Sequence, residues 1–142
     1  MLNYEVVLRC KGTEEELSNF WEEVLDDDYE EVTLCRMENL GVGILRAPLK
    51  KNAIVFHTEH NIVEWVDKLS KSHPNIQFEV CVNELELGPY ELYIFKNGEQ
   101  FGRIDHQNRI DGEIIRSGID QKYYPDPEDI PFLYLDWASK QV

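Results

Sequence analysis

Two repeating patterns of apolar residues divide the start of the chain into a strand and a helix. In residues 2–10 every second residue is apolar, which is the period of a strand with one buried face. Thr13 and Glu16 then form a capping-box pair three residues apart, and this pattern predicts the start of a helix. From Leu17 to Leu25 apolar side chains recur at helical spacing, with acidic residues on the other side. The sequence therefore predicts a strand that leads into an amphipathic helix.

Short apolar segments predict two more strands before residue 60. Residues 30–37 alternate between apolar and polar side chains, and residues 53–57 form a compact apolar run. Between them, residues 41–46 are either a short strand or an irregular segment, because Gly41 and Gly43 weaken any strand. The pattern leaves that segment open.

A second helix and three further strands follow. A helix is expected to begin at Asn61 and to end before Pro74, which has no backbone N–H to continue it. Residues 76–82 show the cleanest alternation in the chain. Apolar runs at 90–95 and 101–104 flank an Asn-Gly pair, the strongest short-range signal for a β-hairpin. We expect one strand after the helix and then a hairpin.

The last part of the chain gives a mixed signal. Residues 105–121 alternate in charge and hold few apolar side chains, so no element is predicted there. Residues 130–137 place apolar side chains at helical spacing, which predicts a short terminal helix that begins between Asp126 and Asp129. Its aromatic residues either cover the domain's own sheet or form a strip that binds a partner, since Tyr and Trp are favoured at interfaces.

The order of these elements predicts the fold class. Strand–helix–strand occurs twice and is followed by a hairpin and a helix, which is an α+β fold of the ferredoxin-like type. In that fold two helices lie on one face of an antiparallel sheet. No repeat or linker divides the chain. We therefore expect a single domain over residues 1–142, with a ferredoxin-like core at 1–104 and a C-terminal extension at 105–142.

Several short motifs occur in a fixed order within residues 53–102. They are the strand Val55-Phe56-His57-Thr58, the helix end Leu69-Ser70 with His73-Pro74, the strand around Phe78, and Glu84 and Gly88 followed by the Asn97-Gly98 hairpin. In this order the segment resembles the ferredoxin-like domain of the YubB type, found in plasmid and phage proteins of unknown biochemical role. The sequence departs from that pattern at Glu59-His60-Asn61, where small residues and proline are usual, and at Val82, where tyrosine is usual. The resemblance implies a fold and supplies no catalytic residues.

The most unusual feature of the composition is an excess of acidic residues. The 142 residues hold 28 acidic and 14 basic side chains, a net charge of −14. Direct binding to nucleic acid needs a basic surface, so we do not expect it here. At 42% hydrophobic residues, the chain also holds too much core material for an acidic disordered tail.

The acidic residues are concentrated between Glu14 and Glu31, where ten carboxylates occur with no basic residue. One interpretation is a solvated face that keeps the protein soluble. The other is a surface that imitates nucleic-acid phosphates or complements a basic groove and speeds association by electrostatic steering. The docking interpretation assigns partner binding to these residues: Glu15, Glu22, Glu23, Asp26, Asp27, Asp28, Glu30 and Glu31.

The three cysteines and four histidines give little sign of chemistry. Cys10, Cys35 and Cys81 fall in apolar runs without a CxxC pair, which favours core thiols and a reducing, cytoplasmic compartment. His57 and His60 are spaced for two metal ligands, but no third or fourth ligand occurs at a recognised spacing. Charged residues interrupt the apolar N-terminal stretch, so it is not expected to be a signal peptide. No apolar stretch approaches the length of a membrane span.

No phosphate-binding, metalloprotease or nucleophile motif is present, so we expect no catalytic residues, metal or cofactor. The leading hypothesis is a non-enzymatic inhibitor from a mobile element or bacterium. It would dock on the basic surface of a nucleic-acid-acting protein, as anti-CRISPR and anti-defence proteins do, or neutralise a nuclease toxin as an immunity protein. An alternative is a small enzyme or ligand-binding module with Glu84, Glu86 or His57 as acid–base groups. A dimeric structural module is a third possibility, and the pattern leaves monomer and homodimer open.

Overall fold

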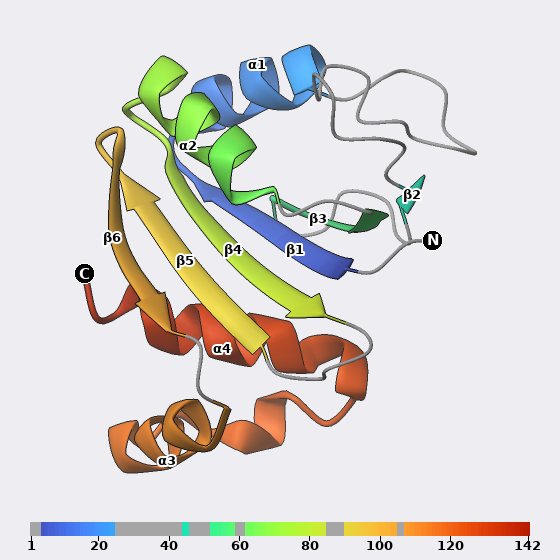
Figure 1. Cartoon of the computed structure of the whole chain (residues 1–142), viewed down its shortest axis with the longest axis vertical. Helices are drawn as coiled ribbons and strands as arrows, with labels where there is room; N and C mark the ends of the chain where they lie inside the picture. The colour runs from blue at the N-terminus through green and yellow to red at the C-terminus, as the bar shows by residue number, and fades with distance from the viewer. Residues whose placement is uncertain (1–3, 25–43, 46–51, 59–61, 85–89, 105–106) are drawn as a thin grey trace.

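The computed structural model describes residues 4–24, 44–45, 52–58, 62–84, 90–104 and 107–142. In this part of the chain an antiparallel sheet lies between helices on its two faces (Figure 1), which confirms the predicted α+β class. The strands are β1 (Tyr4–Lys11), β2 (Ile44–Leu45), β3 (Ala53–Thr58), β4 (Gln77–Glu84), β5 (Tyr90–Lys96) and β6 (Glu99–Ile104). The helices are α1 (Glu14–Val24), α2 (Val63–Ser72), α3 (Gln107–Ser117) and α4 (Ile130–Ser139), with single 3-10 turns η1 (Gln121–Tyr123) and η2 (Pro127–Asp129) before α4.

The sheet has the order β2-β3-β1-β4-β5-β6, and each neighbouring pair is antiparallel. β1 lies between β3 and β4, so that Val7 stands opposite Val55 on one side and Cys81 on the other. Because strand side chains alternate between faces, this register forms rows of side chains that cross several strands on the same face. Those rows position the polar groups of the sheet that are described below.

Helices α1 and α2 contribute to the core on the first face of the sheet. Leu17, Phe20 and Trp21 of α1 and Trp65 and Val66 of α2 are buried in one cluster with alternate residues of β1, β3, β4 and β5. The Phe20 ring meets Phe78 of β4 edge to face, with the ring centroids 5.1 Å apart. The amphipathic pattern of both segments follows from this one-sided burial.

The predicted start of α1 is confirmed by its capping contacts. The backbone N–H of Glu16 donates to Thr13 Oγ1 at 3.2 Å, and the Thr13 hydroxyl donates to Glu16 Oε1 at 2.9 Å. The N–H of Leu17 donates to the Thr13 carbonyl at 3.0 Å. The contact to Thr13 Oγ1 satisfies the Glu16 N–H, one of the backbone donors that the first turn of a helix leaves without an intrahelical partner.

The second face of the sheet is also covered, and this corrects the prediction that residues 2–10 form a half-buried strand. Val7 is 2% exposed and packs in a second core with Leu92 and Ile94 of β5 and with Trp137 of α4. Figure 1 shows α4 lying along this side of the sheet, with α3 beyond it. Both faces of β1 are therefore buried, because the C-terminal segment folds back beneath the strands.

The C-terminal elements were predicted in part. Asn97 and Gly98 have φ values of 55° and 79°, as a two-residue turn with positive φ at both positions requires, and the hairpin of β5 and β6 is confirmed. The terminal helix is confirmed as α4, preceded by η2. α3 was not predicted: its buried apolar stripe holds just Ile110 and Ile114, too little to stand out among charged residues.

Several predicted features lie outside the described residues. They are the strand at 30–37, Gly88, Cys35, Glu86, His60, and the acidic positions Asp26, Asp27, Asp28, Glu30 and Glu31. The side chain of Glu23 is likewise outside the description, although its backbone belongs to α1.

Candidate functional site

The acidic face of α1 is the first candidate, and the structure describes its N-terminal part. Glu14, Glu15 and Glu22 are exposed, whereas Leu17, Phe20 and Trp21 point into the core. Glu15 and Glu22 are seven residues apart and so lie on the same side of the helix. No Lys, Arg or His occurs in α1. Two of the eight predicted partner-binding side chains are thus placed on one solvent-facing stripe.

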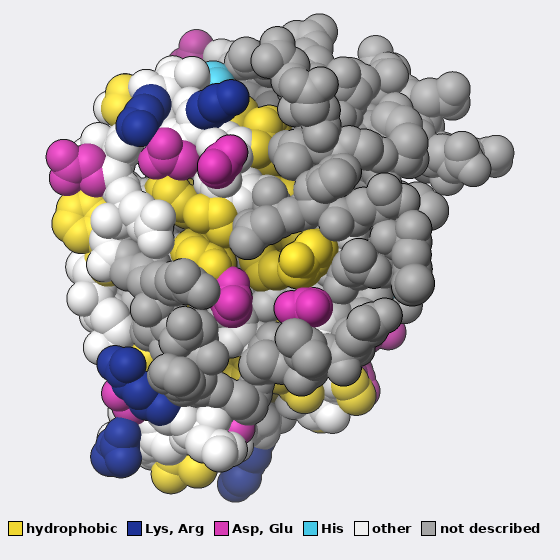
Figure 2. All heavy atoms as spheres, viewed as in Figure 1, with side chains coloured by type: hydrophobic (Ala, Val, Ile, Leu, Met, Phe, Trp, Pro, Cys, Tyr) yellow, Lys and Arg dark blue, Asp and Glu magenta, His cyan; other side chains and the backbone are white. Residues whose placement is uncertain are grey.

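Helix α2 differs from α1 in its surface charge. Lys71 Nζ lies 2.8 Å from Asp67 Oδ2, one turn away on the same helix, and Glu64 and Lys68 are also exposed. Figure 2 shows dark blue and magenta side chains next to one another over this region. Positive and negative groups compensate there, so a field of one sign arises from α1 and not from α2.

A small surface cavity lies between α1 and the turn that follows α2. Its volume is about 260 Å³. Glu16, Asn19 and Phe20 line it from α1, and residues 72–76 line it from the other side. It lies next to the acidic stripe, since Glu16 and Asn19 are neighbours of Glu15 in α1.

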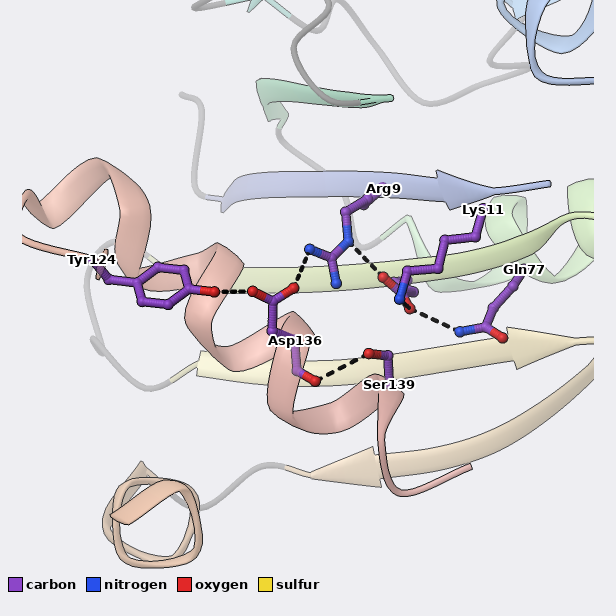
Figure 3. A network of polar contacts seen from close by, with 7 residues as sticks. Arg9, Lys11, Gln77, Tyr124, Asp136 and Ser139 are labelled. Atoms are coloured by element: carbon purple, nitrogen blue, oxygen red, sulfur yellow. Dashed lines mark hydrogen bonds and ion pairs between the residues drawn. The ribbon is translucent and has the colours of Figure 1, made fainter. Parts of the chain in front are cut away.

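A buried ionic network lies on the second face of the sheet, and the sequence did not reveal it. Glu79 of β4 is fully buried, and its Oε1 accepts from Arg9 Nε of β1 at 2.6 Å (Figure 3). The other carboxylate oxygen accepts from Gln77 Nε2 at 2.8 Å and lies 3.2 Å from Lys11 Nζ. The cationic groups and the amide together compensate the cost of burying this carboxylate.

Arg9 also joins the sheet to α4. Its Nη1 donates to Asp136 Oδ1 at 2.6 Å, and the Tyr124 hydroxyl donates to the other oxygen of Asp136 (Figure 3). The Ser139 hydroxyl donates to the Asp136 carbonyl at 3.0 Å. One guanidinium therefore bridges a buried strand carboxylate and a half-buried helix carboxylate, which fixes where α4 lies on the sheet.

The groups around Arg9 raise the pKa of its guanidinium. Burial alone would lower the pKa of its guanidinium, but the charge of Glu79 and hydrogen bonds to Asp136 and Glu79 raise the pKa above its ordinary value. Arg9 therefore stays charged throughout the accessible pH range, and the network is a structural tether rather than a proton donor.

Tyr124 makes the stability of the network depend on pH in the alkaline range. Burial, the hydrogen bond to Asp136 and the Asp136 charge raise the pKa of Tyr124 to about 12, from an ordinary value of 10.0. The neutral Tyr124 hydroxyl therefore contributes its full share of folding stability below pH 10, and this contribution is lost as the pH rises toward 12.

We expect Tyr124→Phe to lose less stability than the parent between pH 10 and 12, measured by urea unfolding. Tyr123→Phe, at a tyrosine that is 80% exposed, should keep the parent profile; an identical profile for both variants would contradict the assignment.

A row of polar side chains crosses four strands on the same face. His57 of β3 stands opposite Glu5 of β1, which stands opposite Asn83 of β4, which stands opposite Tyr90 of β5. His57 Nε2 lies 3.0 Å from Glu5 Oε2, and each side chain is 23% exposed. Asn83 Oδ1 is buried without a hydrogen-bond partner in the described part of the chain. The His57–Glu5 pair is chemically able to exchange a proton with a ligand.

Glu84, another acid–base candidate from the sequence, is not brought to this row. Glu84 is the last residue of β4 and stands opposite Tyr4, on the first face of the sheet, whereas His57 lies on the second. Sequence reasoning singled out His57 but missed Glu5 and Asn83, because strand register alone places Glu5 beside His57 and Asn83 beside Glu5.

The described cysteines are buried thiols. Cys10 and Cys81 are 1% exposed and free of disulfides, which confirms their expected place in the core. Burial raises the pKa of both thiols, with smaller contributions from Glu79 and Glu5. A thiol that holds its proton is a poor nucleophile. Within the described ranges, no group of three or more His, Cys, Asp or Glu side chains is placed to hold a metal ion.

Comparisons with protein-family models, with curated proteins and with solved structures found no match for this chain. Among the described helices, none combines the length and the apolar character needed to cross a membrane.

Proposed function

We propose that this chain is a non-enzymatic acidic binding protein that docks α1 on the basic surface of a nucleic-acid-acting protein and inhibits it. One observation carries the proposal. Glu14, Glu15 and Glu22 are exposed on a helix that has no basic residue and whose opposite side is anchored in the core. A rigid stripe of one charge is suited to a groove that normally holds phosphates.

The contrast with α2 supports a role beyond solubility. A mixture of both signs serves solubility well, and α2 has that mixture, with Asp67 and Lys71 in contact. α1 lacks it, because no basic residue of the helix compensates Glu14, Glu15 and Glu22. An uncompensated acidic stripe is consistent with a function in binding.

The same proposal includes the type of fold and the class of partner. Support for a ferredoxin-like core comes from the order β2-β3-β1-β4, with α1 leading from β1 toward β2 and α2 joining β3 to β4. A YubB-type relationship would place the chain among plasmid and phage proteins, and the acidic surface of α1 is what we take to support an anti-CRISPR or anti-defence role in the cytoplasm. An immunity protein that neutralises a nuclease toxin is the alternative with the same surface chemistry.

The test reverses charge on the stripe while keeping the net charge matched. We expect Glu15→Lys/Glu22→Lys to lose capture of a basic nucleic-acid-binding protein from bacterial lysate at low salt, because each contact turns from attraction into repulsion. The control Glu99→Lys/Glu128→Lys makes the same charge change at exposed positions on the hairpin and before α4. Captured proteins are identified by mass spectrometry.

Two results would reject the docking surface. One is equal loss of capture in both double variants, which would indicate an effect of net charge alone. The other is unchanged capture by Glu15→Lys/Glu22→Lys when circular dichroism shows that the fold is intact.

The His57–Glu5 pair favours a second candidate, a small ligand-binding or enzymatic module. A partly exposed imidazole 3.0 Å from a carboxylate is a usable acid–base pair. A panel of metabolites and metal ions tested by melting shift should then include a ligand whose stabilisation disappears in His57→Gln. Absence of any ligand that distinguishes the variant from the parent would remove this candidate.

A further inference from the structure

The cavity beside α1 has the size and position of a site for a single side chain. At about 260 Å³ it is smaller than the roughly 300–1,000 Å³ of typical cofactor and drug-sized pockets. Phe20 and Ile76 form its buried floor, and Asn19, Ser72 and Asn75 form its exposed rim. A group that enters from solvent therefore meets polar atoms first and apolar atoms below them.

Two independent features of the cavity favour a cation. The Glu16 carboxylate lines it, and no Lys or Arg side chain does. The opposite wall begins at Ser72, the last residue of α2, where backbone carbonyls give the helix end a partial negative charge and where Lys71 of the same turn is paired with Asp67. The acidic stripe of Glu15 and Glu22 adds a field of the same sign at the entrance.

The remaining lining groups favour a planar cation with several donors. Asn19 and Asn75 each supply an amide oxygen that accepts hydrogen bonds. The half-buried His73 ring lines the cavity and is held edge to face against Phe20, with the centroids 5.2 Å apart. A guanidinium stacks on flat rings and bonds a carboxylate through two N–H groups, whereas an ammonium is a compact, strongly hydrated charge.

We propose that this cavity receives an arginine side chain of the basic partner, with the guanidinium on Glu16 and against the His73 ring. This inference rests on the proposed function and makes it more specific, because it assigns one anchoring residue to an otherwise diffuse electrostatic surface. Such an anchor fixes the register of docking, while the exposed stripe guides the approach.

The experiment uses the full chain and small probes, so it needs no identified partner. N-acetyl-arginine-N-methylamide is titrated into isotope-labelled protein and followed by NMR. We expect saturable shifts confined to the amides of the cavity residues, with a dissociation constant on the order of 10 mM. The citrulline analogue, which has the same shape without the charge, should give no saturable shift.

Two substitutions in the same helical turn separate the cavity from the general acidity of α1. Glu16→Gln removes the cavity charge and keeps a residue that completes a capping box, and it should weaken binding about tenfold. Glu15→Gln removes the same charge from the exposed stripe and should change binding less than twofold, by the weak worth of exposed ion pairs.

Three results would overturn the arginine site. They are equal effects of the two substitutions, binding of a further probe, N-acetyl-lysine-N-methylamide, as tight as that of the arginine probe, and shifts spread along α1 without saturation. A failed capture experiment together with saturable, Glu16-dependent arginine binding would reject the proposed docking on a nucleic-acid-acting protein and keep the cavity assignment. The reverse pair of results would reject the anchor and keep the docking surface.

Discussion

We expect Arg9→Met to lower the free energy of unfolding by about 3–5 kcal/mol, the usual cost of leaving one member of a buried ion pair without its partner. Glu79 is fully buried and lies 2.6 Å from Arg9 Nε, so the substitution leaves a carboxylate in the core with Gln77 and Lys11 alone. It also removes the contact to Asp136 that joins the sheet to α4. Typical domains have about 5–15 kcal/mol of stability in total, and urea unfolding followed by tryptophan fluorescence measures the loss.

Two further variants show whether the loss comes from the unpaired carboxylate. Lys11→Met removes a cation that is 49% exposed and 3.2 Å from the same carboxylate, and it should cost about 1 kcal/mol or less. Arg9→Met/Glu79→Leu removes both charges and should recover a large part of the loss, because no charge then stays buried in the strands. Equal destabilisation by Arg9→Met and Lys11→Met would contradict the network as described.

Trp137→Ala should also cost about 3–5 kcal/mol, the range for truncating a buried tryptophan. Trp137 is 2% exposed and packs in the second core with Val7, Leu92 and Ile94. Successive residues of β1, β4 and β5 alternate between the two cores, so a defect beneath the sheet weakens strands that also hold α1 and α2. We therefore expect one cooperative transition at lower denaturant, seen together by far-ultraviolet circular dichroism and fluorescence.

The matched control is Ile115→Ala in α3, where the side chain is 68% exposed. It should change stability by less than about 0.5 kcal/mol. Two separate transitions in Trp137→Ala, with just one of them shifted, would show that the C-terminal helices unfold independently of the strands, against the shared-strand argument.

Local patterns predicted the elements that depend on local physics. The capping contacts of Thr13 and Glu16, the positive φ values of Asn97 and Gly98, and the helical spacing from Ile130 to Trp137 depend on neighbours within a few residues. The same kind of signal failed for α3, because burial of Ile110 and Ile114 depends on α4 lying above them.

Local patterns did not predict the polar contacts on the second face of the sheet. Alternation along β4 places Glu79 on the face of the strand away from Phe78 and Val80, and a side chain on that face would normally point into solvent. The carboxylate is buried because Arg9 stands opposite it in β1, 70 residues away in sequence, and because α4 closes over both. The His57–Glu5 contact has the same origin, in pairing across 52 residues.

One part of the candidate binding surface was predicted from the sequence and the other part was not. An uninterrupted acidic helix is visible in the order of residues, since charge and helical period are local properties. The cavity is not, because it needs the end of α2 to lie beside the first turns of α1.

The amino-acid sequence by itself determined the acidic helix, the hairpin, the terminal helix and the α+β class, since each depends on short-range periodicity, backbone preference or charge. Tertiary structure alone decided that the sheet is covered on both faces, that Arg9 ties Glu79 to Asp136, and that Glu16 and His73 share a cavity. These features require residues far apart in the chain to meet, and their free energy comes from burial and pairing that exist after the strands are in register and the helices are packed.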